Sequence, residues 1–370
     1  MMNVKTSTRQ ISGTFDKVRD RWATAPGYQR WIVYVLVIVL ALLLPNDGIA
    51  SFMSPDADWA TILFDPIGIY ILLALGLNIV VGHAGLLDLG FVAFFAIGAY
   101  SLAYMGTKHG WSFWTCLVLG IVLAAVAGVV LGGPTLRLRG DYLAIVTLGF
   151  GEIVRIVALN TNEIGGAQGI FGIPTPPAIG GLEFSLANPV SYYYLVVFMI
   201  ALVVIVSRRL EKSRVGRAWT AIREDEDAAE LMGVPTFKFK LLAFFVGASI
   251  GGFAGVAEAA KINYIQPQNF PFLLSATILV CVVFGGPGNI PGVIVGAFLI
   301  AWLPERFREF HDYRYMIFGA VLVIMMILRP EGLLPSRRRR AEMAEGSGGM
   351  GSMGGEVASP DAHVEAEVAK

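Results

Sequence analysis

The sequence predicts an all-α integral membrane protein with about ten transmembrane helices, each needing about 20 apolar residues. Of its 370 residues, 55% are hydrophobic and only 15% are charged, whereas soluble domains usually carry about 25% charged residues. The 28 basic residues balance the 28 acidic ones, which argues against a nucleic-acid partner. Both cysteines, Cys116 and Cys281, lie in apolar segments, so no disulfide framework is expected.

Ten apolar segments are expected to form the helices. They lie near residues 31–44, 64–81, 89–106, 113–131, 141–158, 191–206, 241–262, 272–284, 292–303 and 315–328. Two of them, 272–284 and 292–303, are short and flank the sequence GGPGNIPG. They form either one broken, re-entrant element or two separate spans, so nine to eleven spans are compatible with the pattern.

The distribution of lysine and arginine predicts the orientation. Residues 1–30 carry six basic residues and loop 207–240 carries eight, and a further basic stretch follows Arg329, whereas loops 45–61 and 159–190 carry none. Because basic loops stay in the cytoplasm, both termini and loop 207–240 are predicted to be cytoplasmic, in the inner membrane. Loop 304–314 fits this pattern less well, since its three arginines would face outward.

The same patterns divide the chain into regions. The polar residues 1–30 are predicted to be a cytoplasmic segment, because the first apolar segment begins only at Trp31, too late for a cleaved signal peptide. Residues 31–330 are expected to form the transmembrane domain. Residues 331–370 are basic at first and then rich in Gly, Ser, Ala and Glu, which predicts a disordered cytoplasmic tail.

The sequence offers no support for catalysis by this chain alone. A phosphate-binding P-loop requires Lys directly after Gly, and no lysine in the chain follows a glycine. The four histidines are widely spread and show no metal-ligand spacing. We therefore expect no cofactor and no metal ion to be bound by this chain.

Loop 207–240 is too long for a simple turn and is predicted to contain a short helix. Ala218, Ile222, Ala229 and Met232 recur at helical spacing, with charged residues between them. The sequence Asp227-Ala228-Ala229-x3-Gly233 places small residues where another protein could approach the backbone, and Gly233 would end the helix. The alternative is a solvated helix held by its own ion pairs, such as Glu226 with Arg223.

Several blocks of the sequence resemble one family of permeases. Asp227-Ala228-Ala229-x3-Gly233 is similar to the Glu-Ala-Ala-x3-Gly loop of ABC importer permeases, with Asp in place of Glu. The similarity to LivM-type permeases of branched-chain amino acid ABC importers covers roughly residues 65–335. It is carried by four blocks: GLNIVVGHAGLLDLGFVAFFAIGAY (76–100), GDYLAIVTLGFGEIVRI (140–156), GRAWTAIREDEDAAELMG (216–233) and EFHDYRYMIFGAVLVIMMILRPEGLLP (309–335).

The resemblance implies a type-II-like ABC importer permease fold and a division of labour among subunits. Two permease chains, this one and a related LivH-like partner, would form the pathway. Two separate ATPases would bind ATP and magnesium, and an extracytoplasmic binding protein would deliver leucine, isoleucine or valine. The helix over 218–233 would be the coupling helix that contacts an ATPase, with the candidate residues Ala218, Ile222, Arg223, Glu224, Asp227, Ala228, Ala229 and Gly233.

Three other functions stay open. Permeases for urea or short amides share much of the first block, although the ending of the fourth favours amino acids. An ion-coupled secondary transporter would have no use for a 34-residue cytoplasmic loop with a small-residue helix. A channel would conduct without ATP.

Two glycine-rich interruptions of apolar segments are candidates for the translocation pathway. One contains Gly82, His83, Gly85 and Asp88, and the other contains Gly285, Gly286, Pro287 and Gly288. Paired interruptions in the two halves of a transporter can mark discontinuous helices along the substrate path. Close helix packing through small residues or a plain tight turn would leave the same pattern.

Charged residues inside the predicted spans form two pairs at a spacing of three. Glu152 and Arg155 share a helix face, as do Glu258 and Lys261. Each pair is either a structural ion pair or a direct contact to a zwitterionic amino acid, which needs one partner of each sign.

Loop 159–190 is rich in Gly, Pro and Asn and is predicted to lie outside the membrane. We expect it to form part of the surface on which a binding protein docks, with a short re-entrant turn at Gly165–Gly172. A flexible external loop is the alternative.

Overall fold

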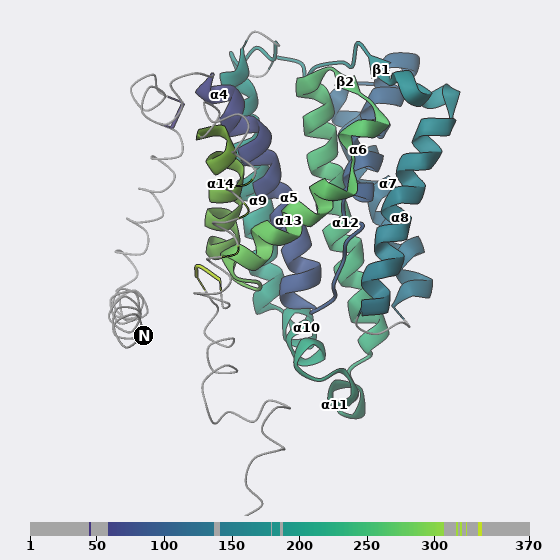
Figure 1. Cartoon of the computed structure of the whole chain (residues 1–370), viewed down its shortest axis with the longest axis vertical. Coiled ribbons are helices and arrows are strands. Elements are labelled where there is room, and N and C mark those ends of the chain that lie inside the picture. Colours follow the sequence, from purple (N-terminus) through teal and green to yellow (C-terminus); the bar gives the residue numbers. More distant parts are fainter. Residues whose placement is uncertain are drawn as a thin grey trace, which may run out of the picture. The chain divides into compact units, whose positions relative to one another are not determined.

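The fold is known from a computed structural model, which describes residues 44–45, 58–136, 141–178, 180–185, 188–306, 316, 319, 323 and 332–334. The chain divides into two compact units, residues 1–60 and 61–370. All elements discussed below, apart from the first two residues of α4, belong to the second unit (Figure 1).

The described residues are mainly helical. The first helical segment consists of α4 (Trp59–Ile62), η1 (Leu63–Gly68), α5 (Ile69–Leu77) and η2 (Asn78–His83), which follow one another directly. It is kinked at Asp65, whose backbone is extended (φ −133°, ψ 121°). The next helices are α6 (Val92–His109), α7 (Phe113–Thr135), α8 (Asp141–Asn160) and α9 (Pro189–Lys212). After these come α10 (Arg214–Glu224), α11 (Glu226–Leu231), α12 (Thr236–Ile262), α13 (Phe272–Gly285) and α14 (Ile290–Arg306).

Eight of the ten predicted spans coincide with helices of the structure. They correspond to η1–α5–η2, α6, α7, α8, α9, α12, α13 and α14. The other two, 31–44 and 315–328, fall almost wholly outside the described residues. Six helical segments are long and apolar enough to cross a membrane by length and composition, which confirms a multi-pass, all-α architecture.

Helix α12 lies at the centre of this bundle and packs against α5, α6 and α7. Its glycines allow very close approach of neighbouring backbones: a Cβ atom on Gly98 of α6 would lie 2.6 Å from the Cα of Gly252. A Cβ atom on Gly252 itself would lie 2.6 Å from the Gly120 carbonyl oxygen of α7. Small residues at such crossings favour van der Waals packing between helices inside a membrane.

Helices α7 and α8 present apolar side chains to the outside of the subunit. Val118, Val126 and Val130 of α7 and Tyr142 and Ile145 of α8 are all more than half exposed. In a soluble protein such a surface would be costly, whereas in a membrane it meets lipid or another apolar subunit.

The two ends of the bundle differ. At one end lie α10 and α11, and at the other lies a short ribbon of β1 (Ile170–Phe171) and β2 (Tyr264–Ile265) (Figure 1). These strands pair antiparallel, and the rings of Phe171 and Tyr264 stack with centroids 4.1 Å apart. The ribbon ties loop 159–190 to the connection after α12, a contact between distant segments that the sequence pattern did not predict.

Loop 159–190 begins with η3 (Asn162–Ile164) and η4 (Gly166–Gln168), which are short 3-10 turns. The expected turn at Gly165–Gly172 therefore consists of η4 and β1. Gly165 and Gly169 both have positive φ angles, 93° and 76°, which glycine adopts without steric cost. Another 3-10 turn, η5 (Pro267–Asn269), precedes α13.

Candidate coupling and translocation site

The predicted coupling helix consists of two helices, so the prediction of one helix over 218–233 is wrong. The break is at Asp225, whose backbone is extended (φ −156°, ψ 110°). Its side chain caps α11 by accepting a hydrogen bond of 3.0 Å from the Ala228 N–H. Ser213 caps α10 in the same way, because its Oγ accepts from the Val215 N–H at 3.1 Å. Each short helix thus has its own N-cap, which stabilises a separate helix start.

Helix α10 is fastened to the bundle through its apolar face. Ala218, Trp219 and Ile222 are buried, which agrees with the predicted apolar positions 218 and 222. The indole Nε1 of Trp219 donates a hydrogen bond of 2.7 Å to the Phe239 carbonyl of α12. Trp219 was missed by the helical pattern, although a large aromatic residue between Ala218 and Ile222 is a signal for such an anchor.

Helix α11 combines a buried small residue with an exposed apolar end. Ala229 is buried, whereas Leu231 and Met232 are 89% and 84% exposed. The predicted apolar face therefore does not continue to Met232, which points away from the subunit. Gly233 has a φ of 83° and open space around it, as expected of a residue that ends a helix.

The charged residues of this region are divided between its surface and its contact with the bundle. Glu224, Asp227 and Ala228 are exposed. Glu226 forms an ion pair with the buried Lys240 of α12, a contact that neither interpretation of the loop predicted. These contacts hold α10 and α11 against the start of α12.

Arg223 brings the coupling region into contact with both glycine-rich interruptions. Its Nη1 donates a hydrogen bond of 2.6 Å to the carbonyl oxygen of Gly82. A Cβ atom on Gly85 would lie 2.8 Å from the Arg223 Cγ, and one on Gly288 would lie 3.1 Å from Nη1. We call Gly82, Gly85, Arg223, Gly288 and Asn78 the glycine junction.

Asn78 completes the glycine junction from η2. Its buried Oδ1 accepts a hydrogen bond of 2.8 Å from the Gly288 N–H. A Cβ atom on Gly82 would collide with this amide and lie 2.5 Å from the Gly288 nitrogen. The junction thus joins the two interruptions, and its Asn78–Gly288 hydrogen bond links residues that are 210 positions apart in the sequence. Sequence reasoning missed Asn78, although a buried amide in an otherwise apolar segment is a usable signal.

The remaining residues of the second interruption build a tight connection. Pro287 and Gly288 form the turn between α13 and α14, while Gly286 has a φ of 105°. The Gly285 carbonyl accepts a hydrogen bond of 3.2 Å from the Leu334 N–H. Over 272–303 the structure has two helices, α13 and α14, which pack against each other. Both the re-entrant element and the two separate spans are compatible with this arrangement.

Asp88 belongs to a different contact from its neighbours in the first interruption. It is fully buried, and its Oδ1 accepts a hydrogen bond of 2.8 Å from the Gly90 N–H. The adjacent Leu89 N–H donates to Thr147 Oγ1 of α8 at 3.0 Å. The other oxygen, Oδ2, and the Nε2 of His83 are buried without a hydrogen-bond partner among the described residues. The segment 84–91 therefore runs from the glycine junction to α8.

Glu152 and Arg155 form the structural ion pair that was one of the two expectations. Arg155 Nε donates to Glu152 Oε2 at 2.8 Å, and both side chains are about one-third exposed. The pair lies on α8, away from the cavity described next.

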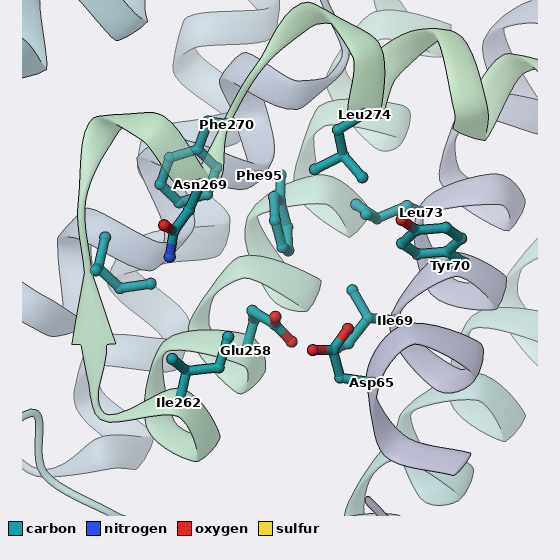
Figure 2. A pocket seen from close by; sticks show the side chains of 11 residues that line it. Asp65, Ile69, Tyr70, Leu73, Phe95, Glu258, Ile262, Asn269, Phe270 and Leu274 are labelled. Carbon is teal, nitrogen blue, oxygen red and sulfur yellow. The ribbon is translucent and has the colours of Figure 1, made fainter. Parts of the chain in front are cut away.

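A cavity of about 240 Å³ lies among η1, α5, α6, α12 and η5, and Figure 2 shows its lining. Asp65 and Glu258 point toward one another across it. The Lys261 Nζ, which the sequence paired with Glu258, lies 5.1 Å from the centre of the Tyr192 ring. Asp65 was missed, although a carboxylate just inside an apolar span is itself a signal for a functional site.

Similar proteins of known name are permeases. The family described as branched-chain amino acid transport system / permease component matches residues 62–326. The high-affinity branched-chain amino acid transport system permease protein LivM of Escherichia coli (strain K12) is 44% identical over 300 residues, covering 75% of this chain and 71% of that protein. No solved structure matches the chain.

More distant relatives carry two related names. A probable branched-chain amino acid transport permease protein LivM of Methanocaldococcus jannaschii is 26% identical over 326 residues, which cover 73% of this chain and 91% of that protein. The permease protein LivH of Escherichia coli (strain K12) is 25% identical over 285 residues, covering 72% and 91%. The matched region contains the glycine junction, α10, α11 and the cavity. This chain belongs to the family of branched-chain amino acid transport permeases.

Proposed function

We propose that this chain is the LivM-like permease subunit of an ATP-driven ABC importer that moves leucine, isoleucine and valine across the inner membrane. The observation that carries the proposal is the glycine junction. Arg223 of α10 bonds to Gly82 and touches Gly288, so one side chain of the coupling region contacts both membrane interruptions. A displacement of α10 and α11 would therefore be passed directly to the helices η2, α13 and α14.

The exposed end of α11 is the proposed contact for an ATPase. Leu231 and Met232 project from a helix whose other apolar residue, Ala229, is buried. Apolar side chains exposed in this way mark interaction sites. The coupling residues are then divided by role: Ala218, Ile222 and Ala229 anchor the region, Arg223 transmits motion, and Asp227, Ala228 and Gly233 lie at the docking surface.

The other partners follow from the same assignment. A second, LivH-like permease would complete the pathway, two ATPases would bind ATP and magnesium, and this chain would bind no cofactor. Loop 159–190 lies at the end of the bundle opposite α10 and α11 (Figure 1), which supports its role as part of the docking surface for an extracytoplasmic binding protein. The basic residues of 1–30 and 207–240 support a cytoplasmic location for both termini and the coupling region.

Reconstitution tests this assignment. The chain is inserted into proteoliposomes with its LivH-like partner and two ATPases, and uptake of radiolabelled leucine is measured with and without ATP and binding protein. We expect uptake only when both are present. Uptake driven by an ion gradient without ATP, passive flux, or uptake of urea but not leucine would each contradict the proposal.

A further inference from the structure

The cavity between η1 and α12 holds two facing carboxyl groups in apolar surroundings. Asp65 and Glu258 both line the cavity, and Figure 2 shows their oxygens turned toward each other. Carboxylate oxygens accept hydrogen bonds and donate none, so neither group is a natural partner for the other. The pair thus presents hydrogen-bond-accepting oxygens to the cavity.

One oxygen of this pair is buried at the cavity wall without a hydrogen-bond partner among the described residues. Glu258 is only 8% exposed, and its Oε2 has no hydrogen-bond partner within the described part of the chain. A buried polar atom without a partner is costly and calls for an explanation. Glu305 adds its negative field at Asp65, and none of the described residues that line the cavity is basic.

The remaining walls are largely apolar. They include Ile69, Leu73, Phe95, Phe270 and Leu274, and in Figure 2 these side chains surround the space above the carboxyl pair. The volume of about 240 Å³ is below the roughly 300–1,000 Å³ of pockets for drug-sized ligands. The site therefore suits a small molecule with one cationic group and a compact hydrocarbon part.

We propose that this cavity binds the α-ammonium group and aliphatic side chain of a branched-chain amino acid, with Asp65 and Glu258 accepting hydrogen bonds from the ammonium. This assignment of substrate contacts rests on the proposed importer function. An ammonium offers three donors and no acceptor, which matches an acidic pair with an unused oxygen. A metal ion fits less well, because no group of three or more His, Cys, Asp or Glu among the described residues could hold one.

Protection of an engineered cysteine tests the assignment without using transport. Ile262→Cys introduces a partly exposed thiol at the cavity wall, and its labelling by N-ethylmaleimide is followed in the assembled, nucleotide-free permease complex. The chain with only its buried Cys116 and Cys281 gives the background. The ligands are 3-methylbutylamine, which keeps the isobutyl group and the ammonium, and 4-methylpentanoate, which carries a carboxylate instead.

We expect the amine, but not the carboxylate, to slow labelling. In the Asp65→Asn/Glu258→Gln background, the amine concentration for half protection should rise about tenfold, because hydrogen bonds between charged groups are roughly twice as strong as neutral ones. Glu152→Gln removes a carboxyl group outside the cavity and should leave protection unchanged. Since the double variant could misfold, Glu258→Gln alone is measured as well and should give an intermediate loss.

Three results would overturn the assignment of this cavity. They are equal protection by amine and carboxylate, protection by magnesium chloride alone, and full protection in both acid-pair variants. The outcome is separable from that of the proposed function. ATP-driven leucine uptake together with absent amine protection rejects only the cavity assignment. Amine protection in a complex that takes up no leucine rejects only the importer assignment.

Discussion

The glycine junction and the cavity of the helix bundle use polar groups in opposite ways. At the glycine junction, Arg223, Gly82, Asn78 and Gly288 satisfy one another through short hydrogen bonds between distant segments. In the cavity, Glu258 keeps one buried oxygen without a partner among the described residues. Satisfied buried networks hold elements in fixed positions, whereas the unpartnered Glu258 oxygen is where we propose that a ligand binds. The junction is therefore suited to transmit motion and the cavity to bind.

The largest effect is expected from filling the glycine junction. Gly82→Val places a branched side chain where even a Cβ atom would collide with Asn78 and the Gly288 backbone. We expect ATP-dependent leucine uptake to be abolished, because the junction cannot close. Gly149→Ala is the matched control, since a Cβ atom there meets nothing within 4 Å and uptake should be normal. Uptake by the Gly82→Val complex would show that the junction is not a tight contact in the working transporter.

A smaller effect is expected at the exposed end of α11. Leu231→Glu/Met232→Glu adds two charges to side chains that are 89% and 84% exposed. Hot-spot residues of an interface contribute about 2 kcal/mol or more, so the Kd for the ATPase should rise about 30-fold. Co-purification with the tagged ATPase measures the change, and Leu231→Met serves as the conservative control. An unaltered Kd in the charged variant would place the ATPase contact elsewhere.

The smallest effect is expected where α10 is anchored. Trp219→Phe removes the hydrogen bond to the Phe239 carbonyl but keeps most of the buried ring. The free energy of unfolding should fall by about 1 kcal/mol, which thermal denaturation of the purified complex detects as a lower Tm. Trp111→Phe, at a tryptophan that is 42% exposed, should leave Tm unchanged. A similar Tm for both variants would mean that the indole bond does not hold α10.

The sequence alone predicted the helices well, because their signal is local. Eight predicted apolar segments correspond to helical segments of the structure, and the glycine-rich interruptions were identified by their composition. The break between α10 and α11 was missed, although Asp225 followed by Glu226 and Asp227 is a typical start of a helix. The apolar pattern gave no sign of this break, because Ala218 and Ile222 before it and Ala229 after it are all buried.

Contacts between distant segments could not be predicted. The bond from Arg223 to Gly82 joins residues 141 positions apart, and no pattern in either segment specifies the other. Glu258 was paired with Lys261 by helical spacing, whereas in the folded chain Asp65 faces it from another helix. Side-chain spacing within one helix describes only the neighbours on that helix, so the cavity required the packed structure.

The central claim is that Arg223 couples the α10–α11 region to the membrane helices. The most direct test measures ATP hydrolysis and leucine uptake together in proteoliposomes that contain the complete transporter. In the Arg223→Ala variant we expect binding-protein-stimulated hydrolysis to continue while uptake falls about tenfold, since a hydrogen bond from a charged donor is worth about 1.5–3 kcal/mol. Arg223→Lys should restore part of the uptake. An unchanged number of ATP molecules hydrolysed per leucine in Arg223→Ala would contradict the claim.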